Sequence, residues 1–129
     1  MASKPHILVA DNDNDALAVT TAVLERLGYN TQGEAKSFAA LKTFSDDPGK
    51  FDLIIIEPVM PDLSGIDLAV RVRPIRRGCP AMFYSGYTDR SLEETIKTAG
   101  LPQALPKPLG SPEMGEAVRE ALPNGHANE

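Results

Sequence analysis

The sequence predicts an α/β fold: a doubly wound sheet of five parallel strands flanked by five helices. Short apolar runs, typical of buried strands, alternate five times with longer segments of helical periodicity. Strands and helices that alternate in this way form a parallel sheet with helices on both faces. The most apolar run, 53–56, is almost all isoleucine, which favours a central strand covered on both sides.

Each strand and the first two helices follow from local patterns. The predicted strands are residues 6–10, 29–34, 53–56, 81–84 and 104–105, of which the second is polar enough for a sheet edge. The first helix has Asp13 or Asn14 as its N-cap and stops at Gly28. The second helix is predicted to be capped by Ser37 and to carry Phe38 on its apolar face, together with Leu41 and Phe44.

Glycine and proline bound the remaining helices. The third begins at Gly65 and should end or kink at Pro74, whose ring removes a backbone donor and clashes with the preceding turn. The fourth covers 91–99 and is closed by Gly100. The last begins at Ser111, a cap that is followed by proline in the first turn.

Composition and charge exclude several classes of protein. With 42% apolar and 24% charged residues, the chain can form one domain, predicted over 1–123, before a disordered tail over 124–129. The net charge of −5 disfavours nucleic acid or an anionic membrane as the partner. One cysteine, Cys79, excludes an intrachain disulfide, and no run of about 18 apolar residues predicts a membrane span. The sequence therefore predicts a soluble, cytoplasmic protein.

Polar residues stand where four of the predicted strands end. Asp11 and Asn12 follow the first strand, Glu57 follows the third, Ser85 the fourth and Lys107 the fifth. Loops that leave the carboxyl ends of parallel strands converge on one crevice. These five side chains are therefore predicted to form a single polar pocket.

Four motifs carry a resemblance to a known family. They are ILVADND, MPDLSG, YSG and KP, which begin at residues 7, 60, 84 and 107. With all four in register over residues 6 to about 122, the chain resembles the receiver domain of bacterial two-component response regulators, a flavodoxin-like module. The resemblance implies phosphorelay signal transduction through protein–protein contacts, with no enzymatic output on this chain.

The resemblance also implies a role for each pocket residue. Glu57 stands at the position of the phosphoacceptor aspartate, Ser85 at that of the switching hydroxyl, and Lys107 at that of the lysine that balances phosphoryl charge. The bond between Lys107 and Pro108 is expected to be cis, as is common in the family. The positions where the family holds Mg²⁺ are those of Asp11, Asn12, Glu57 and the backbone carbonyl of Val59.

Two of these positions depart from the family pattern. Glutamate is one methylene longer than aspartate, so the carboxylate of Glu57 reaches about 1 Å further. Misplacement of that size slows proximity-dependent reactions on the order of 100-fold. Asn12 replaces a carboxylate and weakens the Mg²⁺ site. The favoured hypothesis is a stand-alone atypical receiver in which Glu57 lies close to Lys107 and partly occupies the space of a phosphoryl group, so that phosphorylation is impaired or absent.

Two other features bear on signal output. Ala104 stands where the family commonly has an aromatic residue, three positions before the lysine, so the usual aromatic switch is expected to be missing. The only basic cluster is favoured as a solvated helix end, with a docking patch for an acidic partner as the alternative. Its members are Arg71, Arg73, Arg76 and Arg77.

Alternatives to the favoured hypothesis stay open. The chain could be a working phosphoacceptor that takes phosphate from a histidine kinase with Mg²⁺, despite Glu57 and Asn12. A small-molecule or flavin-binding protein on the same fold is less favoured, because the loop ADNDND after the first strand has no glycine and would repel a phosphate. The expected partner is a histidine kinase or another signalling protein, and a homodimer is compatible with the family.

Overall fold

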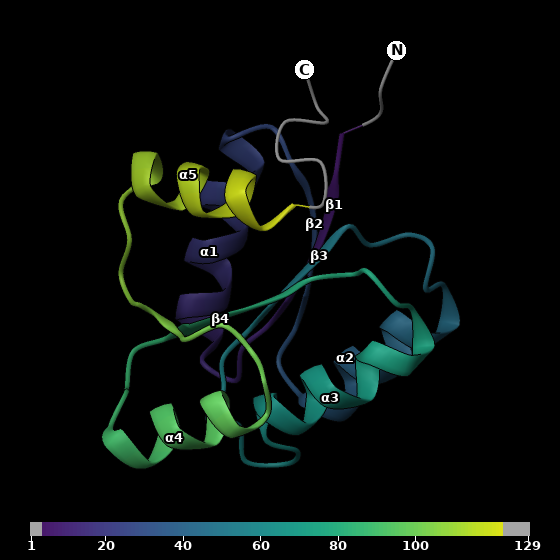
Figure 1. Ribbon diagram of the computed structural model, residues 1–129. Coiled ribbons are helices and arrows are strands. Elements are labelled where there is room, and N and C mark those ends of the chain that lie inside the picture. Colours follow the sequence, from purple (N-terminus) through teal and green to yellow (C-terminus); the bar gives the residue numbers. More distant parts are fainter. Residues whose placement is uncertain (1–3, 123–129) are drawn as a thin grey trace.

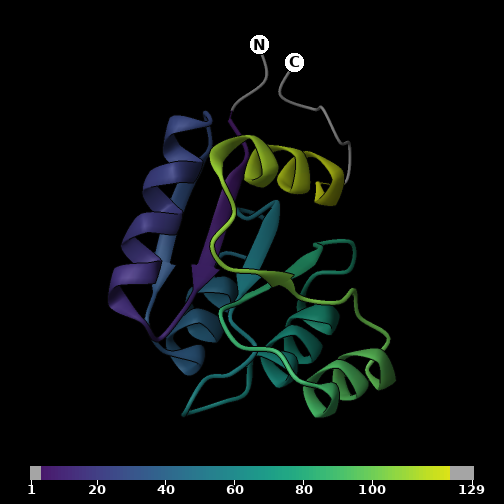
Figure 2. The ribbon, with the colours of Figure 1, turned by 90° about the vertical axis from the view of Figure 1, so that its left-hand side faces the viewer.

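All five predicted strands lie in one parallel sheet in the computed structural model, which describes residues 4–122. They are β1 (His6–Ala10), β2 (Asn30–Glu34), β3 (Leu53–Ile56), β4 (Ala81–Ser85) and β5 (Leu105–Pro106). Their order is β2-β1-β3-β4-β5, so the second strand is added on one side of β1 and the last three strands are added on the other. Figure 2 shows the arrows of β1, β2 and β3 pointing the same way. The predicted doubly wound α/β fold is confirmed.

Helices cover both faces of this sheet. They are α1 (Asn14–Arg26), α2 (Ser37–Asp46), α3 (Gly65–Ile75), α4 (Arg90–Thr98) and α5 (Ser111–Ala121). Figure 1 shows α1 and α5 on one side of the strands and α2, α3 and α4 on the other. None of these helices, nor any other in residues 4–122, has the length and apolarity that a bilayer crossing requires.

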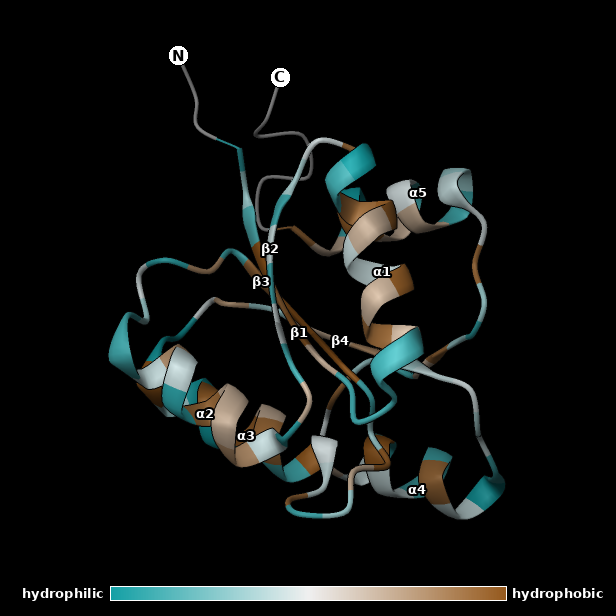
Figure 3. Cartoon of the chain, turned by 180° about the vertical axis from the view of Figure 1, so that it is seen from behind, coloured by the Kyte–Doolittle hydropathy of each residue, from teal (hydrophilic) through white to brown (hydrophobic). Residues whose placement is uncertain are grey.

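The strands build two cores because successive side chains point to opposite faces of a sheet. Leu8 and Ile54 pack with α2, α3 and α4, whereas Ile7 and Ile55 pack with α1 and α5. All four residues of β3 are buried, as predicted for a central strand. Figure 3 shows the hydrophobic colour concentrated on β1 and β3, while β2 is polar and lies at the sheet edge.

The sheet ladder continues one residue beyond the strands and fixes three of the predicted pocket residues. The backbone N–H of Asp11 donates to the Glu34 carbonyl oxygen at 3.0 Å, and that of Glu57 donates to the Ala10 carbonyl oxygen at 2.9 Å. The N–H of Lys107 donates to the Ser85 carbonyl oxygen at 2.9 Å. Backbone pairing thus places these side chains at the carboxyl edge of the sheet before any side-chain contact is made.

The start of α2 differs from the prediction. Ser37 is the first residue of the helix, and the N-cap is Lys36, which makes no side-chain capping bond. The carboxylate of Asp62 instead accepts from the N–H groups of Ser37 at 3.2 Å and Phe38 at 3.0 Å. Phe38 was predicted on the apolar face of this helix but is 51% exposed, whereas Ala40 is buried. A cap supplied from 25 positions away leaves no local signal in the sequence.

Other boundaries shift by a residue. Gly110, not Ser111, is the N-cap of α5, and the fifth strand lies one residue later than predicted. The N-cap of α4 is Asp89, whose side chain accepts from Leu92 N–H at 2.8 Å. The helix α3 ends one residue after Pro74, in line with its predicted effect. The tail predicted over 124–129 lies outside the described residues.

Gly65 sits where only a hydrogen atom fits, and this generates a stability prediction. A Cβ there would press against the carbonyl oxygen of Glu57 and lie 2.7 Å from the Pro58 Cα. Because backbone atoms cannot give way easily, Gly65→Ala is expected to lower the free energy of unfolding by about 1–3 kcal/mol in urea denaturation. Gly49→Ala is the matched control, since a Cβ there meets nothing within 4 Å and the change should stay under about 1 kcal/mol. Equal effects in the two variants would contradict the close packing of α3 on the end of β3.

Candidate functional site

The ammonium group of Lys107 lies between two carboxylates at the carboxyl edge of the sheet. Its Nζ donates to Asp11 Oδ2 and lies 3.1 Å from Glu57 Oε1. The three residues are far apart in the chain, with 96 positions between Asp11 and Lys107, yet their side chains are only 5–15% exposed. The predicted contact between Glu57 and Lys107 is therefore present in a largely buried pocket.

The second carboxylate oxygen of Glu57 is also engaged. Its Oε2 accepts from the Ser85 hydroxyl at 2.8 Å and from the backbone N–H of Val59 at 3.0 Å. Since Oε1 contacts Lys107, both oxygens of this carboxylate have a donor. Glu57 is only 8% exposed, so these contacts replace the water that a carboxylate would otherwise bind.

Ser85 connects the Glu57 carboxylate to the loop that follows β4. Its Oγ lies 2.6 Å from the Tyr87 carbonyl oxygen and accepts from the Tyr87 N–H at 3.1 Å. A hydroxyl carries one hydrogen, so Ser85 donates either to Glu57 or to the Tyr87 carbonyl at a given moment. The position of this loop is thus coupled to the pocket through a single side chain.

The start of α1 holds the other carboxylate. Asp11 Oδ1 accepts from the Asp13 N–H at 3.0 Å, and Asp11 is 3% exposed. Asp13 is the N-cap of α1, because its side chain accepts from the N–H groups of Asp15 and Ala16. One Asp11 oxygen therefore faces the helix start while the other faces Lys107.

The two carboxylates keep Lys107 charged. Burial alone would lower the pKa of its ammonium group, but hydrogen bonds and charge attraction from Asp11 and Glu57 outweigh burial and hold the pKa above its usual 10.5. The ring of Tyr84 lies below it, with 5.6 Å from Nζ to the ring centre. At neutral pH one cation thus faces two carboxyl groups.

The structure brings together four of the five residues predicted to form the pocket: Asp11, Glu57, Ser85 and Lys107. The fifth, Asn12, is exposed and makes no hydrogen bond to the pocket within the described part of the chain. Val59 contributes its N–H to Glu57, a contact that sequence reasoning did not anticipate. The bond between Lys107 and Pro108 is cis, as expected.

The donor set does not fit a Mg²⁺ site in this arrangement. A hard divalent cation needs several oxygen ligands, normally with more than one carboxylate free to bind it. Here Lys107 contacts both carboxylates, and Asn12 brings an amide where a third carboxylate would add charge. Over residues 4–122, no three His, Cys, Asp or Glu side chains gather as metal ligands.

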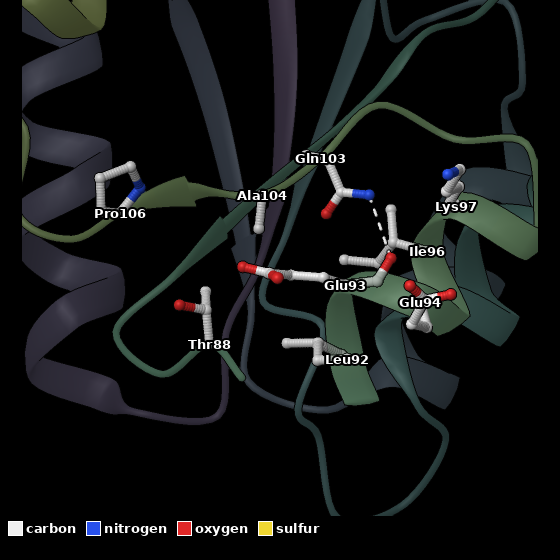
Figure 4. A pocket seen from close by; sticks show the side chains of 9 residues that line it. All are labelled: Thr88, Leu92, Glu93, Glu94, Ile96, Lys97, Gln103, Ala104 and Pro106. Atoms are coloured by element: carbon white, nitrogen blue, oxygen red, sulfur yellow. Dashed lines mark hydrogen bonds between the residues drawn. The ribbon is translucent and has the colours of Figure 1, made fainter. Parts of the chain in front are cut away.

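A surface cavity opens beside Ala104, as Figure 4 shows. It has a volume of about 450 Å³ and is bordered by Leu92, Ile96 and the carboxylates of Glu93 and Glu94. Ala104 presents only a methyl group to it, so no ring fills this space. The absence of an aromatic side chain at position 104 therefore leaves a hollow between α4 and β5.

Comparison with known proteins identifies the family. Residues 7–119 match the family model described as the response regulator receiver domain. The chain belongs to this family. Receiver domains of this kind act in two-component phosphorelay signalling, and the resemblance inferred from the four motifs is confirmed at that level.

Relatives and solved structures agree with the assignment. The chain is 35% identical over 118 residues to the transcriptional regulator NtrC of Azospirillum brasilense, covering 90% of this chain but only 24% of that protein. It is 27% identical to the response regulator receiver protein CpdR of Brucella abortus, covering 90% of this chain and 95% of that one. A CheY-like receiver domain from Methanospirillum hungatei has the same fold, with a TM-score of 0.85 at 24% identity over 98% of this chain and all of that one.

Lys107 should be the main stabilising residue of the pocket. In Lys107→Met the two carboxylates lose their cation, and breaking a buried pair in this way is expected to lower the free energy of unfolding on the order of 3 kcal/mol at pH 7. Because the folded pKa of Lys107 is raised, its contribution is full below about pH 10.5 and is lost as the pH rises through the folded value. The difference between the wild-type protein and the variant, measured by urea denaturation, should therefore narrow above pH 10.5.

The matched control is Lys42→Met, which removes an exposed ammonium group that pairs with Asp46 at 2.9 Å. Exposed pairs contribute little, so this variant should unfold close to the wild-type midpoint at every pH. A Lys107→Met variant as stable as the control would contradict a central role for the buried ion pair.

Proposed function

We propose that this chain is an atypical receiver domain in which the Glu57 carboxylate takes the place of a phosphoryl group. One observation carries the proposal: Lys107 and Ser85, the donors that the family directs at phosphoryl oxygens, both contact Glu57. Glu57 stands at the phosphoacceptor position because it directly follows β3 and precedes the MPDLSG motif. The extra methylene extends the carboxylate to these donors.

The same contacts impair ordinary phosphorylation. A carboxylate that attacks a phosphohistidine needs a free oxygen aimed along the line of attack. The rate of attack falls steeply when that oxygen is misplaced. Both oxygens of Glu57 are already bound to donors, and Lys107 is shared with Asp11. An incoming phosphoryl group would have to displace the Glu57 carboxylate from the residues that should stabilise it.

Weak or absent Mg²⁺ binding is part of the same proposal. Receiver domains bind Mg²⁺ at the phosphorylation site, and the metal offsets phosphoryl charge in the family's reaction. Asn12 contributes no charge, and the ammonium of Lys107 contacts the carboxylates that a metal would need. Lys107 therefore takes over the charge balance that a metal would otherwise supply.

The output of such a protein is a contact with another protein. The pocket would be held in one state by its own charges, so signalling would depend on which partner reads the surface. We expect a histidine kinase or another signalling protein as the partner, in the cytoplasm, with a homodimer as a second arrangement. In this proposal the chain itself catalyses no further reaction.

The pocket should reject phosphate unless two residues are changed. After incubation with acetyl phosphate and Mg²⁺, intact-mass measurement of the wild-type protein is expected to detect no gain of a phosphoryl group. The double variant Glu57→Asp/Asn12→Asp shortens the acceptor and restores the missing charge, so it should gain one phosphoryl group. Mg²⁺ affinity, followed by calorimetry, should rise in the same variant.

A variant with the same chemical changes outside the pocket provides the control. Glu25→Asp/Asn30→Asp alters two exposed residues and should behave as the wild-type protein does. A stable phosphoryl group on Glu57 of the wild-type chain would favour a working phosphoacceptor instead. If the Glu57→Asp/Asn12→Asp variant also gains no phosphoryl group, Glu57 and Asn12 are not what prevents phosphorylation. A yellow preparation would favour the flavin-binding alternative.

A further inference from the structure

A groove lies on the surface between α3 and α4, outside the pocket. Two adjoining hollows of about 360 and 390 Å³ form it, and both are lined by Ile66 and Thr95. Figure 1 shows α3 and α4 on the same side of the strands. Six large apolar side chains are exposed in the described part of the chain, and Val59, Val70 and Tyr87 of these line the groove. Half of the exposed apolar groups therefore gather in one place, which is typical of an interaction site.

The groove is also acidic. Asp67 lies on α3, Asp89 caps α4, and Glu94 lies on α4, while no Lys, Arg or His of residues 4–122 lines either hollow. Hydrogen bonds from the Leu92 N–H and then from the Tyr87 hydroxyl lower the pKa of Asp89, so its charge persists at neutral pH. An apolar floor with carboxylates and no cation is complementary to a segment that carries apolar and basic side chains.

We propose that this groove binds a basic amphipathic helix of a partner protein. Apolar residues of the helix would lie on Val59, Ile66 and Val70, and Lys or Arg side chains beside them would face Asp67 and Glu94. A helix suits the site because its two walls are helices, and a third helix can pack its side-chain ridges between them.

A second copy of this chain fits the groove less well. The basic cluster of the sequence belongs to the end of α3 and the turn after it, so groove and cluster are different surfaces on neighbouring parts of one molecule. Contact between them would be head-to-tail and would not close into a dimer. Arg76 is moreover occupied, because its guanidinium donates to the carbonyl oxygens of Pro48 and Phe51.

One end of the groove is built from the loops that hold the pocket. Val59 donates its N–H to Glu57 Oε2, and the backbone of Tyr87 contacts the Ser85 hydroxyl. A helix on the groove would therefore touch both loops that the Glu57 carboxylate positions. The inference goes beyond the proposed function, since the groove exists whether or not Glu57 accepts a phosphoryl group.

A defined peptide tests the groove directly. The probe is an amidated helical peptide of about 18 residues made of Leu and Lys, with all Leu on one face, and its control is a scrambled peptide of the same composition. Binding to the ¹⁵N-labelled protein near physiological salt should shift amide signals of α3, α4 and the loop after β3. The scrambled peptide carries the same charge without an apolar face and should bind more weakly.

Charge reversal gives the sharpest comparison. Asp67→Lys/Glu94→Lys should weaken binding of the probe roughly tenfold, because two attractive exposed charges become repulsive. Glu116→Lys/Glu120→Lys changes the net charge equally on exposed positions of α5 and should weaken binding less than about twofold. Val70→Asn should also weaken binding of the probe. Its matched control is Val19→Asn, which alters an exposed valine on α1 and should have a smaller effect.

The outcomes separate the inference from its rivals. Equal losses in the two charge-reversal variants, equal binding of the scrambled peptide, or amide shifts elsewhere would overturn it. If the protein self-associates and Val70→Asn abolishes this self-association, the groove binds a second copy of the chain instead. Because these readouts concern binding and the phosphorylation test concerns mass, failure of one proposal leaves the other standing.

Discussion

The ion pairs of Lys107 with Asp11 and Glu57 are the interaction on which the rest of the site depends. Two carboxylates that share a largely buried pocket repel each other unless a cation lies between them, and desolvation adds to that cost. The ammonium group offsets the repulsion, and its hydrogen bonds to both carboxylates compensate part of the desolvation cost. Ser85 and Val59 then complete the coordination of Glu57, so that the carboxylate is oriented as well as neutralised.

The sheet supplies the precision that this arrangement needs. Backbone hydrogen bonds to the neighbouring strand hold Asp11, Glu57 and Lys107 where they leave their own strands. The strand β5 has only two residues, yet it places the Lys107 N–H within hydrogen-bond distance of the Ser85 carbonyl oxygen. The apolar layers on both faces keep β3 buried along its whole length. Long-range contacts at the pocket are therefore consequences of strand order, and a parallel sheet with this order brings residues 96 positions apart together.

Sequence reasoning could reach the parallel sheet, its central strand and the pocket because all three follow from regular patterns. Apolar runs that end in Asp11, Glu57 and Ser85 identify strand ends, and convergence of those ends is a property of parallel sheets. The cap of α2 was missed because Asp62 reaches it from another loop. The exposure of Phe38 was also missed, since a helix of ten residues gives too few turns to separate the faces by periodicity. Asn12 was expected in the pocket as the neighbour of Asp11, but its side chain lies at the exposed start of the loop.

The presence of Lys107 does not by itself distinguish a receiver that accepts a phosphoryl group from one that does not. With Asp11 and Glu57 both present, the lysine is expected to stabilise the folded pocket whether or not a phosphoryl group ever arrives. Its presence is therefore expected in an active receiver and in an inactive one. Under the proposed function the side chain at position 57 makes the distinction, because glutamate is one methylene longer than aspartate and here contacts the lysine and the hydroxyl itself. The proposal then has a structural consequence: the carboxylate at position 57 itself occupies the pocket in which the family's phosphoryl group would be held.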